Sequence, residues 1–149
     1  MNEKEKNKNE VIEVSKEERE KFLEDLVFKG CAFYEKTLLD GKLKIKLKTL
    51  SGEEQLEIDE KISDIEGTPA QVMHLYSILF LSYALVRYND IDLEKLSKEE
   101  RVSFLKSKPT AIIDKVSEEL FEFNKKIKAS VSGDKVEETF FETTPTSLE

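Results

Sequence analysis

The stretch TPAQVMHLYSILFLSYALVRYN, residues 68–89, decides the fold of this chain. Thr68 followed by Pro69 is typical of a helix start, because proline fits the first helical turn, where no N–H partner is needed. The few polar side chains that follow scatter around a helix axis: His74, Ser77, Ser82 and Arg87. A helix that is apolar on all sides is a buried one, and its uninterrupted apolar stretches fall short of the roughly 18–20 residues of a membrane span. The sequence therefore predicts a central, buried helix over residues 69–89.

Strand-like alternation precedes this helix. In KLKIKLKTL, residues 42–50, Leu43, Ile45 and Leu47 point to one face and the lysines to the other, which is the period of a half-buried strand. Asp40-Gly41 is a strong signal for a hairpin turn, and the residues before it favour a first strand. The sequence therefore predicts an antiparallel hairpin over residues 31–50, with its leucine and isoleucine face buried against helices.

Capping boxes of the form Ser-x-x-Glu mark three further helix starts, because each side chain satisfies a free backbone N–H group near the other. The three pairs are Ser15 with Glu18, Ser51 with Glu54, and Ser97 with Glu100. They predict helices over residues 16–28, over residues 52–66 and, shorter, directly after residue 97. The apolar faces of the first two helices are formed by Phe22, Leu23, Leu26 and Val27, and by Ile58, Ile62 and Ile65, with Leu56 off the second face.

Pro109 begins a last helix, whose apolar stripe is about 100° wide. The stripe consists of Ile112, Ile113, Val116, Leu120, Phe123 and Ile127, and Phe121 lies outside it. Together these elements predict an α+β fold: a mostly helical single domain with one antiparallel β-hairpin packed on the central apolar helix.

The 149 residues suffice for one domain with one core. Residues 1–14, rich in Lys, Glu and Asn, predict a disordered N-terminal arm, because they bury too little apolar surface to become ordered. Val11, Ile12 and Val14 could instead pair as an edge strand. Residues 15–129 form the predicted α+β domain, and residues 130–149 the predicted flexible C-terminal tail.

Composition and charge exclude several classes of function. With 32 acidic and 24 basic side chains the chain has a net charge of −8, which argues against nonspecific binding of nucleic acid. The one cysteine, Cys31, excludes an internal disulfide and fits a reducing compartment. The N-terminus has no apolar signal-peptide segment. We expect a cytosolic protein that binds neither nucleic acid nor membranes.

Side chains that could carry chemistry are sparse. His74 and Cys31 are the only histidine and the only cysteine, and they belong to different predicted elements. The sequence has no CxxC, HExxH, EF-hand loop or glycine-rich phosphate loop. It therefore predicts no catalytic, cofactor-binding or metal-binding residue, and no enzyme. Arg87, at the end of the predicted apolar helix, is expected to reach solvent or to pair with Asp90 or Asp92.

Five residues are candidates for binding a partner: Lys44, Lys46, Phe121, Phe140 and Phe141. The lysine row of the predicted strand is either a solvated face that prevents edge-to-edge pairing or a basic strip for an acidic partner. Phe140 and Phe141 stand among glutamates in the predicted tail. They either belong to a frayed terminus or anchor a short motif in the groove of another protein.

The order of these elements resembles that of a known family. A hairpin with an Asp-Gly turn leads through an alternating strand and a capped acidic helix into a strongly apolar helix. KLKIKLKTLSGEEQLEIDEKI and HLYSILFLSYALVRYN resemble the corresponding segments of the small tail assembly chaperones of bacteriophages and prophages, and of the related chaperones of baseplate hub assembly. The resemblance covers roughly residues 28–128 and includes no catalytic or metal-binding residue.

The resemblance implies a non-enzymatic protein in the cytoplasm of the bacterial host. Such chaperones bind the tape-measure or baseplate hub protein before the tail tube polymerises. A second copy of the same chain, forming a homo-oligomer, is a further possible partner. An amphipathic client helix is kept soluble while its apolar stripe is covered in a groove. The alternative is a structural minor tail or baseplate component of a phage or phage-tail-like particle.

Overall fold

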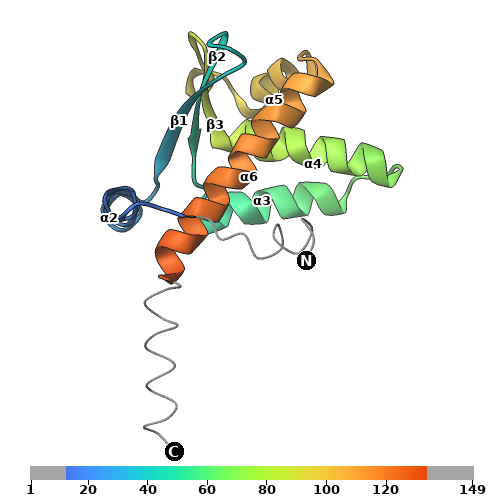
Figure 1. Cartoon of the computed structure of the whole chain (residues 1–149). Coiled ribbons are helices and arrows are strands. Elements are labelled where there is room, and N and C mark those ends of the chain that lie inside the picture. Colours follow the sequence, from blue (N-terminus) through green and yellow to red (C-terminus); the bar gives the residue numbers. More distant parts are fainter. Residues whose placement is uncertain (1–12, 134–149) are drawn as a thin grey trace, which may run out of the picture.

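Four antiparallel strands form one sheet, in the order β1-β2-β3-β4, within residues 13–133, which the computed structural model describes (Figure 1). The strands are β1 (Phe33–Leu38), β2 (Leu43–Lys48), β3 (Leu85–Tyr88) and β4 (Ile91–Asp92). Because β3 and β4 are added to β2, the predicted hairpin is the first half of a larger sheet. The α+β fold class is confirmed.

Helices precede, interrupt and follow the sheet. They are α2 (Lys16–Glu24), continued by the π-helical turn η1 (Asp25–Lys29), α3 (Gly52–Ser63), α4 (Pro69–Ala84), the 3-10 turn η2 (Leu93–Lys95), α5 (Lys98–Lys106) and α6 (Thr110–Ser132). The helices α3 and α4 lie side by side between β2 and β3 in the chain, and α6 crosses the sheet (Figure 1). In residues 13–133, no helix combines the length and the apolar character that crossing a membrane requires.

The predicted hairpin and its register are confirmed. Tyr34 pairs with Leu47 and Leu38 with Leu43, so that the alternating apolar side chains of β2 share one face with these β1 residues. Leu43, Ile45 and Leu47 are all buried, as their alternation with lysine predicts. The turn between the strands places Gly41 at a φ of 84°, a conformation in which only glycine is unstrained.

The apolar stripe of α6 covers this buried face of the sheet. Phe123 is fully buried, its ring stacks on Tyr34 of β1 with centroids 5.1 Å apart, and it meets Phe22 of α2 edge-on at 5.9 Å. The other buried members of the stripe are Ile113, Val116 and Leu120. The hairpin therefore packs chiefly on α6, and the second half of α4 closes the same core through Ile78 and Leu81.

The predicted central helix ends five residues early, and this part of the prediction is wrong. It stops at Ala84, and residues 85–88 form β3, with Tyr88 opposite Ile45 and Arg87 opposite Lys46. Asn89 completes the pairing, because its N–H donates to the Lys44 carbonyl and its Oδ1 accepts from the Lys44 N–H, both at 2.8 Å. The free edge of β2 thus takes up a segment whose composition suits a helix and a strand equally.

The helix predicted over residues 16–28 also changes character near its end. After Glu24 the chain winds as the π-helical turn η1, and Val27, predicted on the buried face, is 72% exposed. A π-turn advances the side chains by a different angle from an α-helix, so the apolar face predicted from a period of 3.6 residues no longer holds there.

The structure shows where the C-terminal end of the predicted domain lies. Residues 130–132 were expected in the tail but complete α6, where Ser130 is fully buried and its carbonyl accepts a hydrogen bond of 2.9 Å from Arg19 Nε. Residues 1–12 and 134–149 lie outside the described residues, and with them most of the predicted N-terminal arm and the candidate residues Phe140 and Phe141.

Candidate protein-binding surfaces

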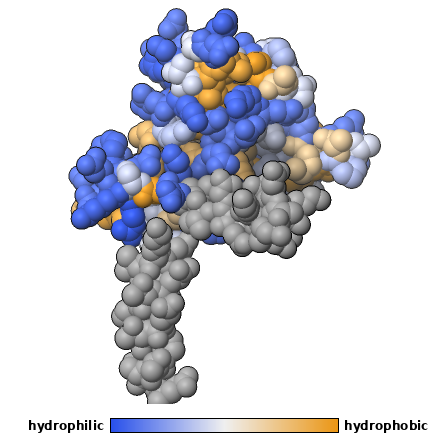
Figure 2. All heavy atoms as spheres, viewed as in Figure 1, coloured by the Kyte–Doolittle hydropathy of each residue, from blue (hydrophilic) through white to orange (hydrophobic). Residues whose placement is uncertain are grey.

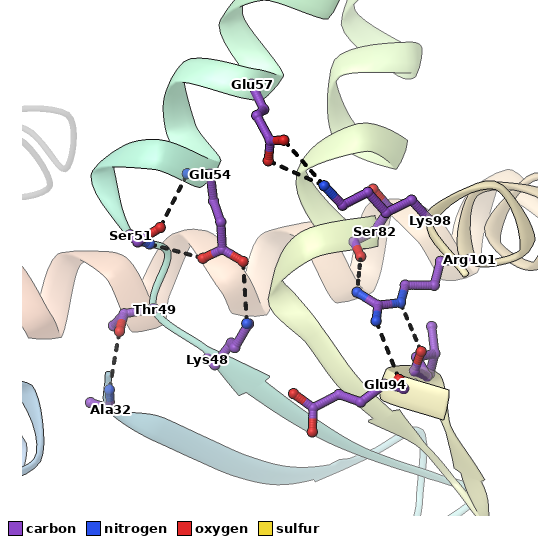
Figure 3. Close-up of polar contacts among 11 residues, drawn as sticks. Ala32, Lys48, Thr49, Ser51, Glu54, Glu57, Ser82, Glu94, Lys98 and Arg101 are labelled. Carbon is purple, nitrogen blue, oxygen red and sulfur yellow. Dashed lines mark hydrogen bonds and ion pairs between the residues drawn. The ribbon is translucent and has the colours of Figure 1, made fainter. Parts of the chain in front are cut away.

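A polar network fixes the start of α3 against the end of β2 (Figure 3). Ser51 and Glu54 form the predicted capping box, with the Glu54 N–H donating to Ser51 Oγ at 3.1 Å and the Ser51 N–H donating to Glu54 Oε1 at 2.9 Å. The second carboxylate oxygen of Glu54 accepts from Lys48 Nζ at 3.3 Å. The last lysine of the row is therefore held within the chain.

Arg101 joins three segments, a role that no sequence pattern indicates. Its Nε donates to the carbonyls of Leu93 and Leu96 at 2.8 and 3.1 Å, and its guanidinium also reaches the carbonyl of Ser82 on α4 at 3.5 Å (Figure 3). These carbonyls lie at the end of α4 and in the connection around η2, where helical partners are lacking. The arginine thus fixes α5 to the base of α4.

A second cluster ties α3 to α4 and α5. Lys98 Nζ lies 3.2 Å from Glu57 Oε1, and its hydrogen bond with this carboxylate raises the pKa of the lysine (Figure 3). Tyr83, buried near the end of α4, accepts a hydrogen bond of 3.2 Å at its hydroxyl from Lys61 Nζ. The first contact ties α3 to α5, and the second ties the last turn of α3 to the last turns of α4.

The helix α3 and the first half of α4 form an arm, which we define as α3 with residues 69–77. The predicted burial of the apolar helix is wrong here, because the buried residues of α4 begin only at Ile78. In the arm, Met73 is 66% exposed and Leu56 is 67% exposed, while three apolar side chains of α4 are half-buried: Val72, Leu75 and Tyr76. Figure 2 shows hydrophobic side chains on α4 toward the free end of the arm.

The opposite surface of the sheet from α6 carries positive charge, and we call it the basic face. Cross-strand pairing places Lys44 beside Thr37, and Lys46 between Glu35 and Arg87. Residues directly opposite each other on antiparallel strands share a face, so these side chains form one surface with Phe33. Lys44 and Arg87 are exposed, whereas Lys46 is half-buried, 3.9 Å from Glu35 Oε1 and 4.7 Å from the centroid of the Phe33 ring.

The structure brings the two candidate lysines together and separates them from the third candidate. Phe121 is 59% exposed on α6, and at about 100° per residue it lies on the side of the helix away from the buried stripe. The helix itself therefore stands between Phe121 and the sheet. Arg87, expected at a helix end, belongs instead to the basic face, with Asp92 opposite it on β4.

A buried carboxylate was missed by the sequence analysis. Glu119 lies on α6 with its Oε1 3.1 Å from Lys36 Nζ of β1, and Lys115 Nζ is 3.9 Å from its other oxygen. The hydrogen bond with Glu119 raises the pKa of Lys36. Glu119 borders the apolar stripe of α6 in a helical projection, so its position could have indicated a buried acid.

Residues 13–133 contain no group of three His, Cys, Asp or Glu side chains that could hold a metal ion. His74 lies in the arm and Cys31 directly before β1, and both are half-buried. The charged contacts described above cap helices or join elements. The arm and the basic face are two surfaces whose exposed side chains suit the binding of another protein.

Comparisons with family models, curated proteins and solved structures give no match to this chain.

Proposed function

We propose that this protein is a non-enzymatic assembly chaperone that binds a tape-measure or baseplate hub protein in the bacterial cytoplasm during phage tail morphogenesis. The resemblance of the two quoted segments to tail assembly chaperones supports this function. One of these segments forms β2 and most of α3, and the other runs through α4 into β3. The resemblance therefore falls on the helices that form the arm.

The observation that carries the proposal is the incomplete burial of α4 in the arm. A helix as apolar as this one is normally enclosed, yet Met73 is exposed and Val72, Leu75 and Tyr76 are only half-buried. An exposed apolar surface of this kind, rimmed by polar residues, is typical of a protein–protein contact. The charged contacts at the base of the arm, around Tyr83 and Arg101, keep it in place without covering it.

The exposed apolar side chains of the arm can bind the apolar stripe of an amphipathic client helix. Two helices that present apolar side chains between them recognise a third helix through residues spaced three and four apart. Binding the unassembled client lowers the concentration of its free form by mass action, which delays aggregation and premature assembly. No bond of the client is changed, and the client is released when its own partners compete for the same stripe.

Co-expression of the chain with a phage tape-measure protein, and separately with a baseplate hub protein, tests this proposal. We expect one of them to co-purify with the wild-type chain, and Met73→Glu and Leu56→Glu to weaken the complex at least tenfold, because each places a charge in the apolar contact. Val131→Glu is the matched control, since Val131 is similarly exposed, at 58%, on the last turn of α6. Phe121→Glu tests whether that side chain adds to the contact.

Two results would contradict the proposal. If no tail protein co-purifies with the wild-type chain, the chaperone function is wrong. If a tail protein binds and both arm variants bind as well as the control, the client site lies elsewhere. Mass spectrometry of purified particles addresses the alternative function, because a structural tail or baseplate component stays in the particle, whereas an assembly chaperone is absent from it.

A further inference from the structure

We propose that the basic face binds the chain's own C-terminal segment, residues 134–149. This inference does not depend on the proposed function, since it concerns a different surface and an occupant within the same chain. Three observations support it: the charges of the two surfaces, an aromatic side chain within the basic face, and the place where α6 ends.

The charges of the face and the segment are complementary. The face presents Lys44, Lys46 and Arg87 beside two carboxylates: Glu35, which is already 3.9 Å from Lys46 Nζ, and Asp92, which is opposite Arg87 on β4. The segment DKVEETFFETTPTSLE has five acidic side chains and one basic, a net charge of −4. A positive surface on a chain whose net charge is −8 attracts acidic segments, and the nearest such segment by sequence connection follows α6.

The face also offers a contact for the aromatic residues of the segment. Phe33 lies half-buried on β1 with Lys46 Nζ 4.7 Å from the centroid of its ring. An aromatic ring beside a cation is a favourable neighbour for a second ring, which gains both apolar contact and cation–π attraction. Phe140 and Phe141 are the aromatic residues of the segment, and Glu138 and Glu142 flank Thr139 and this pair. Charge and aromatic character therefore occur together on both the face and the segment.

The end of α6 lies within reach of the face. Ser130 accepts a hydrogen bond from Arg19 of α2, so α6 ends beside α2, and α2 leads through η1 into β1. Sixteen residues follow Gly133, and an extended chain of that length spans about 50 Å at roughly 3.3 Å per residue. A six-residue strand such as β1 is about 20 Å long. The segment can thus reach the sheet from the end of α6 with length to spare.

Zero-length carbodiimide cross-linking of the full chain, followed by mass spectrometry, tests the proposal, because the reagent joins carboxylates only to lysines in direct contact. We expect links from Glu137, Glu138 or Glu142 to Lys44 or Lys46. Lys61 and Lys106 are the internal control, since both are exposed and lie on α3 and α5, whereas α6 ends beside α2. The links should fall at least fivefold in high salt.

A variant of the segment separates specific binding from general attraction. Phe140→Ser with Phe141→Ser keeps every carboxylate, and we expect it to reduce the links to Lys44 and Lys46 at least threefold. Links spread evenly over all four lysines, or no links at all, would overturn the proposal. Mixing the chain with an isotopically heavy copy identifies the occupant, because light-to-heavy links would show that the segment of a second copy binds the face, which also contradicts the proposal.

Discussion

Arg101 shows how much of this fold depends on single polar side chains at the ends of elements. Its guanidinium donates to the carbonyls of Leu93, Leu96 and Ser82, and it is partly buried among them. Carbonyls at the end of a helix lack helical partners, and an arginine can satisfy several at once because its donors are arranged in a fixed fork. Lysine, with one charged nitrogen, cannot reproduce this geometry.

We expect Arg101→Met to lower the free energy of unfolding by about 2–3 kcal/mol, because hydrogen bonds from a charged donor to partly buried carbonyls are lost together. Arg101→Lys should recover less than half of this loss. Urea unfolding at neutral pH measures both variants. Arg87→Met is the matched control, since Arg87 is exposed on the basic face, and its effect should stay within about 0.5 kcal/mol. Equal effects at the two positions would show that Arg101 does not fix the elements.

At the scale of the element, local patterns predicted most helices and the hairpin but missed two transitions. The alternation in β2 and the capping boxes at Ser51 and Ser97 depend only on neighbouring residues, and the structure contains all of them. Whether residues 85–88 continue α4 depends on the free edge of β2, almost 40 residues away in the chain. A local hydrophobic period does not indicate such a distant partner. The same period does not indicate the π-helical turn after Glu24 either.

The uneven burial of α4 gives a prediction for this element. Leu81 is fully buried, so Leu81→Ala should destabilise the protein by about 2–5 kcal/mol, the range for a large-to-small change in a core. Leu79 is half-buried in the same helix, and Leu79→Ala should remove only about 1–2 kcal/mol, because its surroundings are already partly solvent. Thermal or urea unfolding of both variants measures the difference. A loss at Leu79 as large as that at Leu81 would mean that α4 is enclosed at this point as well.

At the scale of the whole molecule, the basic face could be predicted in part and the arm could not. The lysine row of residues 42–48 is visible in the sequence, and the register adds Arg87, which the sequence assigned to a helix. The proposed function of the arm depends on its apolar side chains being left uncovered. An apolar helix gives the same local signal whether or not its neighbours enclose it, so the exposure of Met73 becomes apparent only when the packing of all elements is known.

The end of the folded domain can be located by truncation. A chain that ends at Gly133 keeps all of α6 and the whole hydrophobic core, so we expect its melting temperature within about 2 °C of the full chain, because the contacts proposed for the removed segment lie on the surface of the sheet. A chain that ends at Ala129 loses the buried Ser130 and the carbonyl that accepts from Arg19 Nε. That loss should reduce the stability by about 1–2 kcal/mol, because Arg19 is left without its partner between α2 and α6.

Calorimetry of the two truncated chains decides between two positions for the domain boundary. For a domain of this size, a loss of about 1–2 kcal/mol corresponds to a melting temperature roughly 3–8 °C lower, well outside the change expected for the longer truncation. Arg19→Ala in the full chain is the control for mechanism, because it removes the same hydrogen bond while keeping α6 intact. If the chain ending at Ala129 melts with the full chain, the contact between Arg19 and Ser130 contributes nothing, and the folded domain ends where the composition changes. If Arg19→Ala and the shorter truncation lower the melting temperature alike, the last turn of α6 stabilises the domain through α2.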